Sequence, residues 1–116
     1  MRIFFNSDAD IGQVAKLIFE ALGIGSFWEG DSHNVLGGTY NSYSIFGINI
    51  KLELNSYDYE DTYRFMLCVK KDMISSLKID MDIENKVSEI VLRVLQYNLN
   101  IPIAVEKNGE LLVDLT

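Results

Sequence analysis

A chain of 116 residues has the length of one ordinary domain, and with 48% hydrophobic residues it can form a core without disulfides or metals. Seventeen acidic residues against ten basic ones give a net charge of −7. This charge disfavours nucleic acid as a direct partner, because such binding depends on Lys and Arg at the phosphates. We therefore expect one domain over residues 1–116 whose partners are not nucleic acids.

The expected location is the cytoplasm. No apolar run reaches the roughly 18 residues that a membrane span requires, which also argues against a membrane partner. The N-terminal residues reach the polar segment 6–8 before the apolar region of a signal peptide could develop. The single cysteine, Cys68, cannot form a disulfide within the chain, so nothing indicates an oxidising compartment.

The N-terminal part of the chain predicts a short strand followed by an amphipathic helix. Residues 2–6 are mostly β-formers. Ser7 and Asp10 have the spacing of a capping box, and Asp10 can also cap a helix alone. Apolar residues then recur at helical spacing, and these are Ile11, Val14, Ala15, Ile18, Ala21 and Leu22. Gly23 stands where a left-handed residue commonly ends a helix, so we expect a helix over about residues 9–22.

The central part, from Ser26 to Asp72, has the composition of β structure. We expect strands at residues 27–29, 39–44, 48–54 and 62–70, separated by glycine-rich or polar turns. The clearest strand is 48–54, in which apolar and polar residues alternate with a period of two. In the strand 62–70 the alternation assigns Tyr63 to the same face as Phe65, Leu67 and Val69.

The C-terminal part predicts a second helix and a hairpin. Asp80 and Asp82 can cap the helix, its apolar stripe runs from Ile83 to Leu95, and it should end near residues 98–100, before Pro102. The expected order is thus β-α-β-β-β-β-α-β-β. This order describes an α+β fold with a mainly antiparallel sheet of about six to seven strands and two helices packed on it.

Two registers are open for the hairpin around Asn108-Gly109. A two-residue turn would pair Val105 with Leu112 and would mix apolar and acidic groups on one face. A three-residue loop over 107–109 would pair Val105 with Leu111 and would bring apolar residues opposite one another along the hairpin. We favour the three-residue loop, although it places two glutamates opposite each other.

No residue pattern indicates catalysis, a metal or a cofactor. Asp31, Ser32 and His33 contain the residue types of a hydrolase triad, but neighbours in sequence cannot adopt that geometry. One histidine and one cysteine are too few for a zinc site, and the acids at 58–61 lack the spacing of a calcium-binding loop. No glycine-rich phosphate loop follows a strand, and Cys68 has no activating neighbour. We expect no catalytic, cofactor-binding or metal-binding residues and no enzymatic activity.

The remaining signal is a surface for protein binding. Six tyrosines are many for this length, and three of them alternate with acids in one segment. Tyrosine provides a large contact area at low entropic cost, and adjacent carboxylates can pair with Lys and Arg of a basic partner. The candidate partner-binding residues are Tyr57, Asp58, Tyr59, Glu60, Asp61 and Tyr63, together with Glu29 and Asp31 of an earlier turn.

Four features stand out between residues 8 and 65: Leu22-Gly23 at the end of a helix, Gly37, Gly38 and Tyr40 before a strand, the alternating strand 48–54, and the segment with Asp58, Tyr59 and Asp61. With these features, this part of the chain resembles immunity proteins of bacterial polymorphic toxin systems, including those of contact-dependent growth inhibition. This resemblance implies a cytoplasmic protein that binds one cognate toxin domain, often a nuclease, and blocks its active site. It implies no enzymatic activity and identifies no contact residues.

Two other interpretations belong to different functional classes. The first is a small regulatory or adaptor domain that binds another bacterial or phage protein. The second is a cryptic hydrolase that uses His33 with partners from elsewhere in the chain. A toxin gene beside this one would separate the immunity protein from the adaptor, and an activity that depends on His33 would favour the hydrolase.

Overall fold

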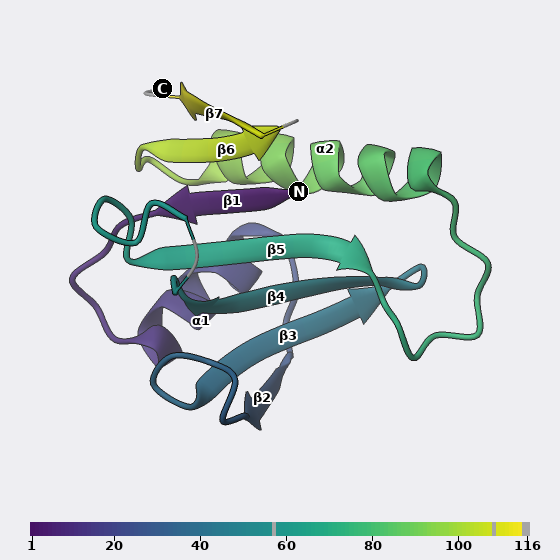
Figure 1. The fold of residues 1–116 in the computed structure, drawn as a ribbon, viewed down its shortest axis with the longest axis horizontal. Coiled ribbons are helices and arrows are strands. Elements are labelled where there is room, and N and C mark those ends of the chain that lie inside the picture. Colours follow the sequence, from purple (N-terminus) through teal and green to yellow (C-terminus); the bar gives the residue numbers. More distant parts are fainter. Residues whose placement is uncertain (57, 108, 115–116) are drawn as a thin grey trace.

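The computed structural model describes residues 1–56, 58–107 and 109–114, which form two helices and seven strands (Figure 1). In chain order the elements are β1 (Arg2–Phe5), α1 (Ile11–Ala21), β2 (Trp28–Asp31), β3 (Thr39–Ile45), β4 (Ile48–Leu54), β5 (Phe65–Lys71), α2 (Met81–Asn98), β6 (Ile103–Lys107) and β7 (Glu110–Asp114). The predicted α+β class and the predicted order of elements are confirmed.

All seven strands belong to one antiparallel sheet with the order β2-β3-β4-β5-β1-β6-β7. The first strand of the chain thus lies between β5 and β6, near the middle of the sheet. Its three apolar residues are buried: Ile3 and Phe5 lie in the main core and Phe4 lies on the opposite face. A strand covered on both faces needs apolar residues at every position, which explains why β1 shows no alternation.

The ends of both helices follow from local sequence. The Asp10 side chain accepts a hydrogen bond from the Gln13 N–H, and the Gln13 side chain bonds back to the Asp10 N–H, which completes a capping box. Gly23 follows α1 with a φ of 75° and donates its N–H to the carbonyl of Glu20, as expected for a left-handed terminal residue. Asp80 caps α2 through the Ile83 N–H. Within the described residues, neither helix has the length and apolarity to cross a bilayer.

Both helices pack on the same face of the sheet, where the main core lies (Figure 1). The apolar stripe of α1 buries Val14, Ala15, Ile18 and Phe19, and α2 contributes Val91 and Leu95. Phe27, just before β2, stacks on Phe19 with ring centroids 4.6 Å apart. This face therefore contains most of the hydrophobic burial that stabilises the domain.

The opposite face of the sheet, called here the open face, is covered by neither of the two helices that the structure describes. A small cluster on it consists of Phe4, Met66 and Ala104, against which Tyr59, Tyr63, Cys68 and Leu111 pack. Arg2 and Glu106 lie opposite each other on β1 and β6 and form a 2.6 Å ion pair. The open face is thus partly apolar and partly charged.

The predicted register of the β6–β7 hairpin is wrong. Val105 pairs with Leu112 and Lys107 pairs with Glu110, so two residues form the turn, and Gly109 has a φ of 77°. The three-residue loop is favoured only if one face of the hairpin is apolar, because that register places the apolar residues of both strands opposite one another. Leu111 instead packs on the open face, so apolar residues are accommodated on both sides. The two-residue turn, whose twist matches that of the strands, is then favoured.

Candidate functional site

Three segments meet at one end of the sheet, called here the acidic end: the β1–α1 connection, the β2–β3 loop and the β4–β5 loop (Figure 1). Asn6 joins two of them, because its side-chain amide donates to the Thr62 carbonyl and accepts from the Arg64 N–H, both at 2.8 Å. The Arg64 guanidinium donates to the carbonyls of Ser7 and Ala9 at 2.9 Å. These bonds hold the start of α1 against the β4–β5 loop.

Hydrogen bonds connect the described residues of the β4–β5 loop to one another. Asn55 is buried, and its side-chain amide donates to the carbonyls of Asp58 and Tyr63, both at 3.0 Å. The Tyr59 carbonyl accepts the N–H groups of Thr62 and Tyr63. Tyr59 has a φ of 63°, which is rare for a residue with a large side chain. These bonds connect the segment 58–63, which carries the acids, to Asn55 at the end of β4.

The two described tyrosines of this loop are packing residues as well as surface residues. The Tyr59 ring meets Phe4 edge to face at 5.5 Å, and the Tyr63 ring lies 6.0 Å from Phe4. Both are half-buried on the open face. The prediction that Tyr63 shares a face with Phe65 is wrong, because β5 begins only at Phe65 and the preceding backbone does not continue the alternation. Tyr57 lies outside the described residues.

The predicted acids of the site are exposed. The Asp58 side chain is 68% exposed and lies 3.9 Å from Arg2, whereas Glu60 and Asp61 border a shallow hollow of about 300 Å³. Leu36 of the β2–β3 loop lies on the other side of this hollow. Carboxylates of the β4–β5 loop thus lie beside an apolar side chain of the neighbouring loop.

Glu29 and Asp31 lie apart from the β4–β5 acids, on the edge strand β2. Both are exposed, and Asp31 is at the end of β2 from which the β2–β3 loop begins. The β2–β3 loop begins after Asp31, and its Leu36 lines the same hollow as Glu60 and Asp61 of the β4–β5 loop. Asp8 and Asp10 at the start of α1 add further exposed carboxylates at the same end.

The cations near the acidic end already have partners. Arg64 bonds to main-chain carbonyls, and Arg2 bonds to Glu106 at 2.6 Å in addition to its longer contact with Asp58. Among the residues that the structure describes at this end, the exposed carboxylates of Asp8, Glu60 and Asp61 are in none of the observed ion pairs. A surface of this kind attracts basic partners and repels phosphates.

Comparison with known proteins supplies no family for this arrangement. No family model, curated protein or solved structure matches the chain. Its function must therefore be argued from the residues and their geometry.

The histidine does not complete a catalytic arrangement with its neighbours. His33 is exposed in the β2–β3 loop. The Ser32 hydroxyl accepts the Asn34 N–H at 3.2 Å, and Asp31 accepts from the Thr39 hydroxyl at 3.5 Å. Among the described residues, no three His, Cys, Asp or Glu side chains are grouped so that they could hold a metal ion.

Among the described residues, sequence reasoning missed three exposed aromatic side chains, which are Trp28, Phe46 and Tyr97. Trp28, the only tryptophan, is 78% exposed on β2, and Phe46 is 69% exposed in the β3–β4 turn. The exposure of Trp28 could have been predicted, because alternation along the strand directs Phe27 to the core and therefore Trp28 to the other face. Exposed aromatics of this size are frequent anchors of protein interfaces.

Cys68 provides a prediction about reactivity. Burial on the open face raises the pKa of its thiol above the ordinary value, although nearby Lys70 acts in the opposite direction. Because the thiolate is the reactive form, less of it is present at pH 8 than in an ordinary exposed cysteine. We expect the folded protein to react with Ellman's reagent at least tenfold more slowly than the same protein in urea. Equal rates in the two states would contradict this.

Proposed function

We propose that the protein is a cytoplasmic immunity protein that binds a cognate toxin domain and neutralises it through the acidic end. The observation that carries this proposal is the excess of exposed carboxylates on loops held by specific hydrogen bonds, of which Asn55 and Arg64 make the most. The partner is then a basic protein surface. Nuclease domains fit this description, because an active site that binds phosphates is itself positively charged.

The conformation of the acidic end favours binding. Hydrogen bonds within the segment 58–63 and to Asn55 reduce the conformational entropy that this segment would lose on association. Complementary charge also raises the rate of encounter, most strongly at low salt. Leu36 and the half-buried ring of Tyr59 supply apolar contact area beside the carboxylates.

The first experiment is the double charge reversal Glu60→Lys with Asp61→Lys. These acids are better targets than Asp58, whose replacement would also disturb Arg2. With the protein encoded beside this one as the toxin, we expect the dissociation constant measured by calorimetry to rise about tenfold or more, since two interface charges are reversed. Growth of toxin-expressing cells should no longer be protected.

The matched control is Glu20→Lys with Glu110→Lys. Both glutamates are exposed, one on α1 and one on β7, and the change in net charge is the same. This variant should bind within about twofold of the original protein. If both variants raise the dissociation constant equally, the change in net charge alone explains the effect, and the acidic end is rejected as the binding surface. A neighbouring protein that is not toxic would reject the immunity function.

A further inference from the structure

The strand β2 forms one edge of the sheet. Among the described strands it pairs only with β3, so its outer side faces solvent (Figure 1). Every residue of β2 is exposed or half-buried. An edge strand keeps a row of N–H and C=O groups without strand partners, to which an extended segment of another protein can bind. The side chains of β2 decide which segment fits.

The register of the β2–β3 ladder shows which backbone groups of β2 point outward. The Ser32 N–H donates to the Gly38 carbonyl at 2.9 Å, so these residues form a hydrogen-bonded pair that continues the ladder beyond β2. In an antiparallel ladder such pairs alternate with pairs whose residues do not bond to each other. Counting back from Ser32, Asp31 and Glu29 belong to the second kind. Their N–H and C=O groups therefore point away from β3, toward the open edge.

The side chains of β2 place acids on one face of the sheet and an aromatic residue on the other. Asn41, which lies opposite Glu29, also lies opposite Leu52 of the main core. Both acids of β2 are therefore on the helix-covered face, and both are exposed. Trp28 is on the open face, where it is 78% exposed. Among the described residues, neither Glu29 nor Asp31 is in an ion pair.

These features define the chemistry of a segment that would fit the edge. Directly opposite residues of paired strands lie on the same face, so Lys or Arg opposite Glu29 and Asp31 would be favourable. The residues between these cations would lie on the open face beside Trp28. The ring of Tyr40 fills the place that a side chain at Gly30 would take, and it extends this apolar surface. The fitting segment therefore alternates basic residues with apolar ones.

We propose that β2 binds an extended segment of a basic partner protein as an additional antiparallel strand, with Lys or Arg opposite Glu29 and Asp31. A second copy of this chain does not fit this edge. In a two-fold antiparallel pair of β2 strands, the acids of one copy would lie against the acids of the other, which is destabilising. Charged residues on an edge strand are a common means of preventing such self-pairing.

The probe is a peptide of eight residues, blocked at both ends, in which lysine alternates with valine or threonine. Trp28 is the only tryptophan and lies on β2, so its fluorescence reports on this edge directly. We expect a saturable change in its emission, with a dissociation constant in the high micromolar range at physiological salt. N-methylation of the lysines removes the N–H groups that face β2 in the proposed pairing and should weaken binding at least tenfold. N-methylation of the intervening residues, whose N–H groups face solvent, should weaken it less than threefold.

Two substitutions at Glu29 separate the backbone hydrogen bond from the charge. Glu29→Pro removes the outward N–H together with the carboxylate, whereas Glu29→Gln removes only the charge. Proline is tolerated on an edge strand where the N–H faces solvent, so both variants should fold. We expect Glu29→Pro to weaken peptide binding at least tenfold, and Glu29→Gln to weaken it about threefold, as for the loss of one cross-strand pair. If Glu29→Pro does not fold, the methylated peptides make the same comparison on the unchanged protein.

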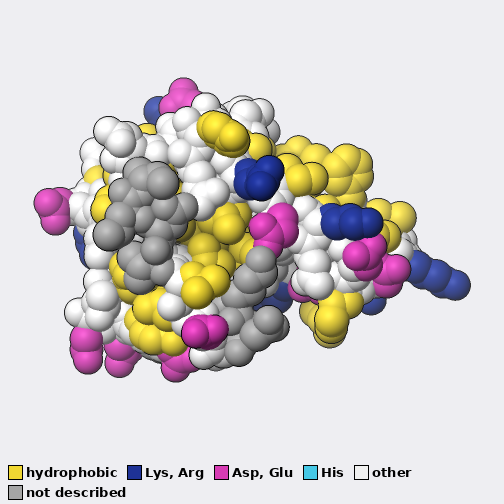
Figure 2. Space-filling model, turned by 90° about the horizontal axis from the view of Figure 1, so that it is seen from above, with side chains coloured by type: hydrophobic (Ala, Val, Ile, Leu, Met, Phe, Trp, Pro, Cys, Tyr) yellow, Lys and Arg dark blue, Asp and Glu magenta, His cyan; other side chains and the backbone are white. Residues whose placement is uncertain are grey.

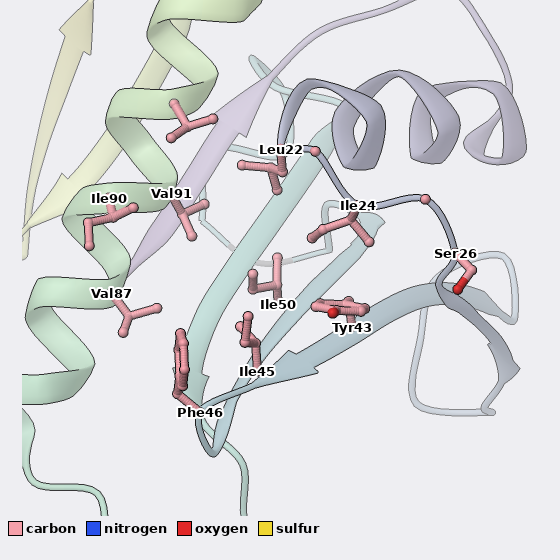
Figure 3. A pocket seen from close by; sticks show the side chains of 13 residues that line it. Leu22, Ile24, Ser26, Tyr43, Ile45, Phe46, Ile50, Val87, Ile90 and Val91 are labelled. Atoms are coloured by element: carbon pink, nitrogen blue, oxygen red, sulfur yellow. The ribbon is translucent and has the colours of Figure 1, made fainter.

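The control variants test whether the peptide binds elsewhere. Apolar side chains gather at the projecting end on the right of Figure 2, which carries the segment 72–80 with Ile74. An apolar hollow of about 480 Å³ lies between α2 and the segment after α1, where Ile90 lines it and no residue of β2 does (Figure 3). Ile74→Gln and Ile90→Gln change these two areas without adding charge. Both variants, and Glu20→Lys with Glu110→Lys, should bind the peptide within twofold of the original protein.

The outcomes of the peptide experiment decide the proposal. It is overturned if the lysine-methylated peptide binds as tightly as the unmethylated one, or if the two methylated peptides are weakened equally. It is also overturned if the emission of Trp28 shows no saturable change. A dimer in light scattering that Glu29→Pro dissociates would overturn it too, because β2 would then pair with a second copy. The experiment needs no toxin, so this proposal and the immunity function can fail separately.

Discussion

Replacing Phe4 with alanine is expected to lower the free energy of unfolding by about 3–5 kcal/mol. Phe4 is fully buried at the centre of the open-face cluster, where it contacts both Tyr59 and Tyr63. Its loss leaves a cavity and removes the surface on which the β4–β5 loop rests. Urea unfolding followed by far-ultraviolet circular dichroism measures the change. The near-ultraviolet signal of the tyrosines should fall as well, because their rings lose a fixed environment.

Tyr97→Ala is the matched control for this substitution. Tyr97 is an exposed aromatic residue on α2, and alanine is a better helix former than tyrosine. Its replacement should change the free energy of unfolding by less than about 0.5 kcal/mol. A loss below about 1 kcal/mol for Phe4→Ala would show that the open face of the sheet is not tightly packed.

Gly47→Ala is expected to destabilise the protein by about 2–4 kcal/mol, for two separate reasons. Gly47 has a φ of 74° in the β3–β4 turn, which is strained for any residue with a Cβ. An added Cβ would also lie 2.8 Å from Ile79 Cγ1 and 3.2 Å from Leu77 Cβ. The segment before α2 would have to move away from the turn. Thermal and urea unfolding measure the loss.

Gly38→Ala separates these two reasons. Gly38 has a similar φ of 82°, but nothing lies within 4 Å of the position that its Cβ would occupy. Alanine there should cost only the backbone strain, about 1–2 kcal/mol. If the two variants lose the same stability, the packing of Ile79 and Leu77 on Gly47 contributes nothing measurable.

The candidate site could be predicted from sequence only in part. The acids at positions 58, 60 and 61 are exposed as expected for charged residues in a polar loop. Composition could not indicate that Tyr59 and Tyr63 would pack on Phe4, because that contact depends on how the loop folds over the sheet. Nor could it show that Leu36, from a different loop, would lie beside Glu60 and Asp61. These neighbours are separated by more than twenty residues in the chain.

The exposed side of α2 was not predictable from periodicity. The spacing from Ile83 to Leu95 predicts one apolar stripe, and such a stripe is normally assigned as a whole to the core. Only the positions of both helices on the sheet leave Ile90 exposed while Val91 and Leu95 are buried. β3 extends to Ile45, so the turn before β4 consists of two residues, Phe46 and Gly47, and both have the positive φ that such a turn requires.

The sequence by itself determined the elements of this protein and their order. Capping residues such as Asp10 and Asp80, the left-handed Gly23 and the alternation in residues 48–54 act within a few residues of one another, so their effect is local. Only the tertiary structure decided the central position of β1, the register of the β6–β7 hairpin and which side of α2 stays exposed. Each of these depends on contacts between segments far apart in the chain, and such contacts leave no periodic pattern in the sequence.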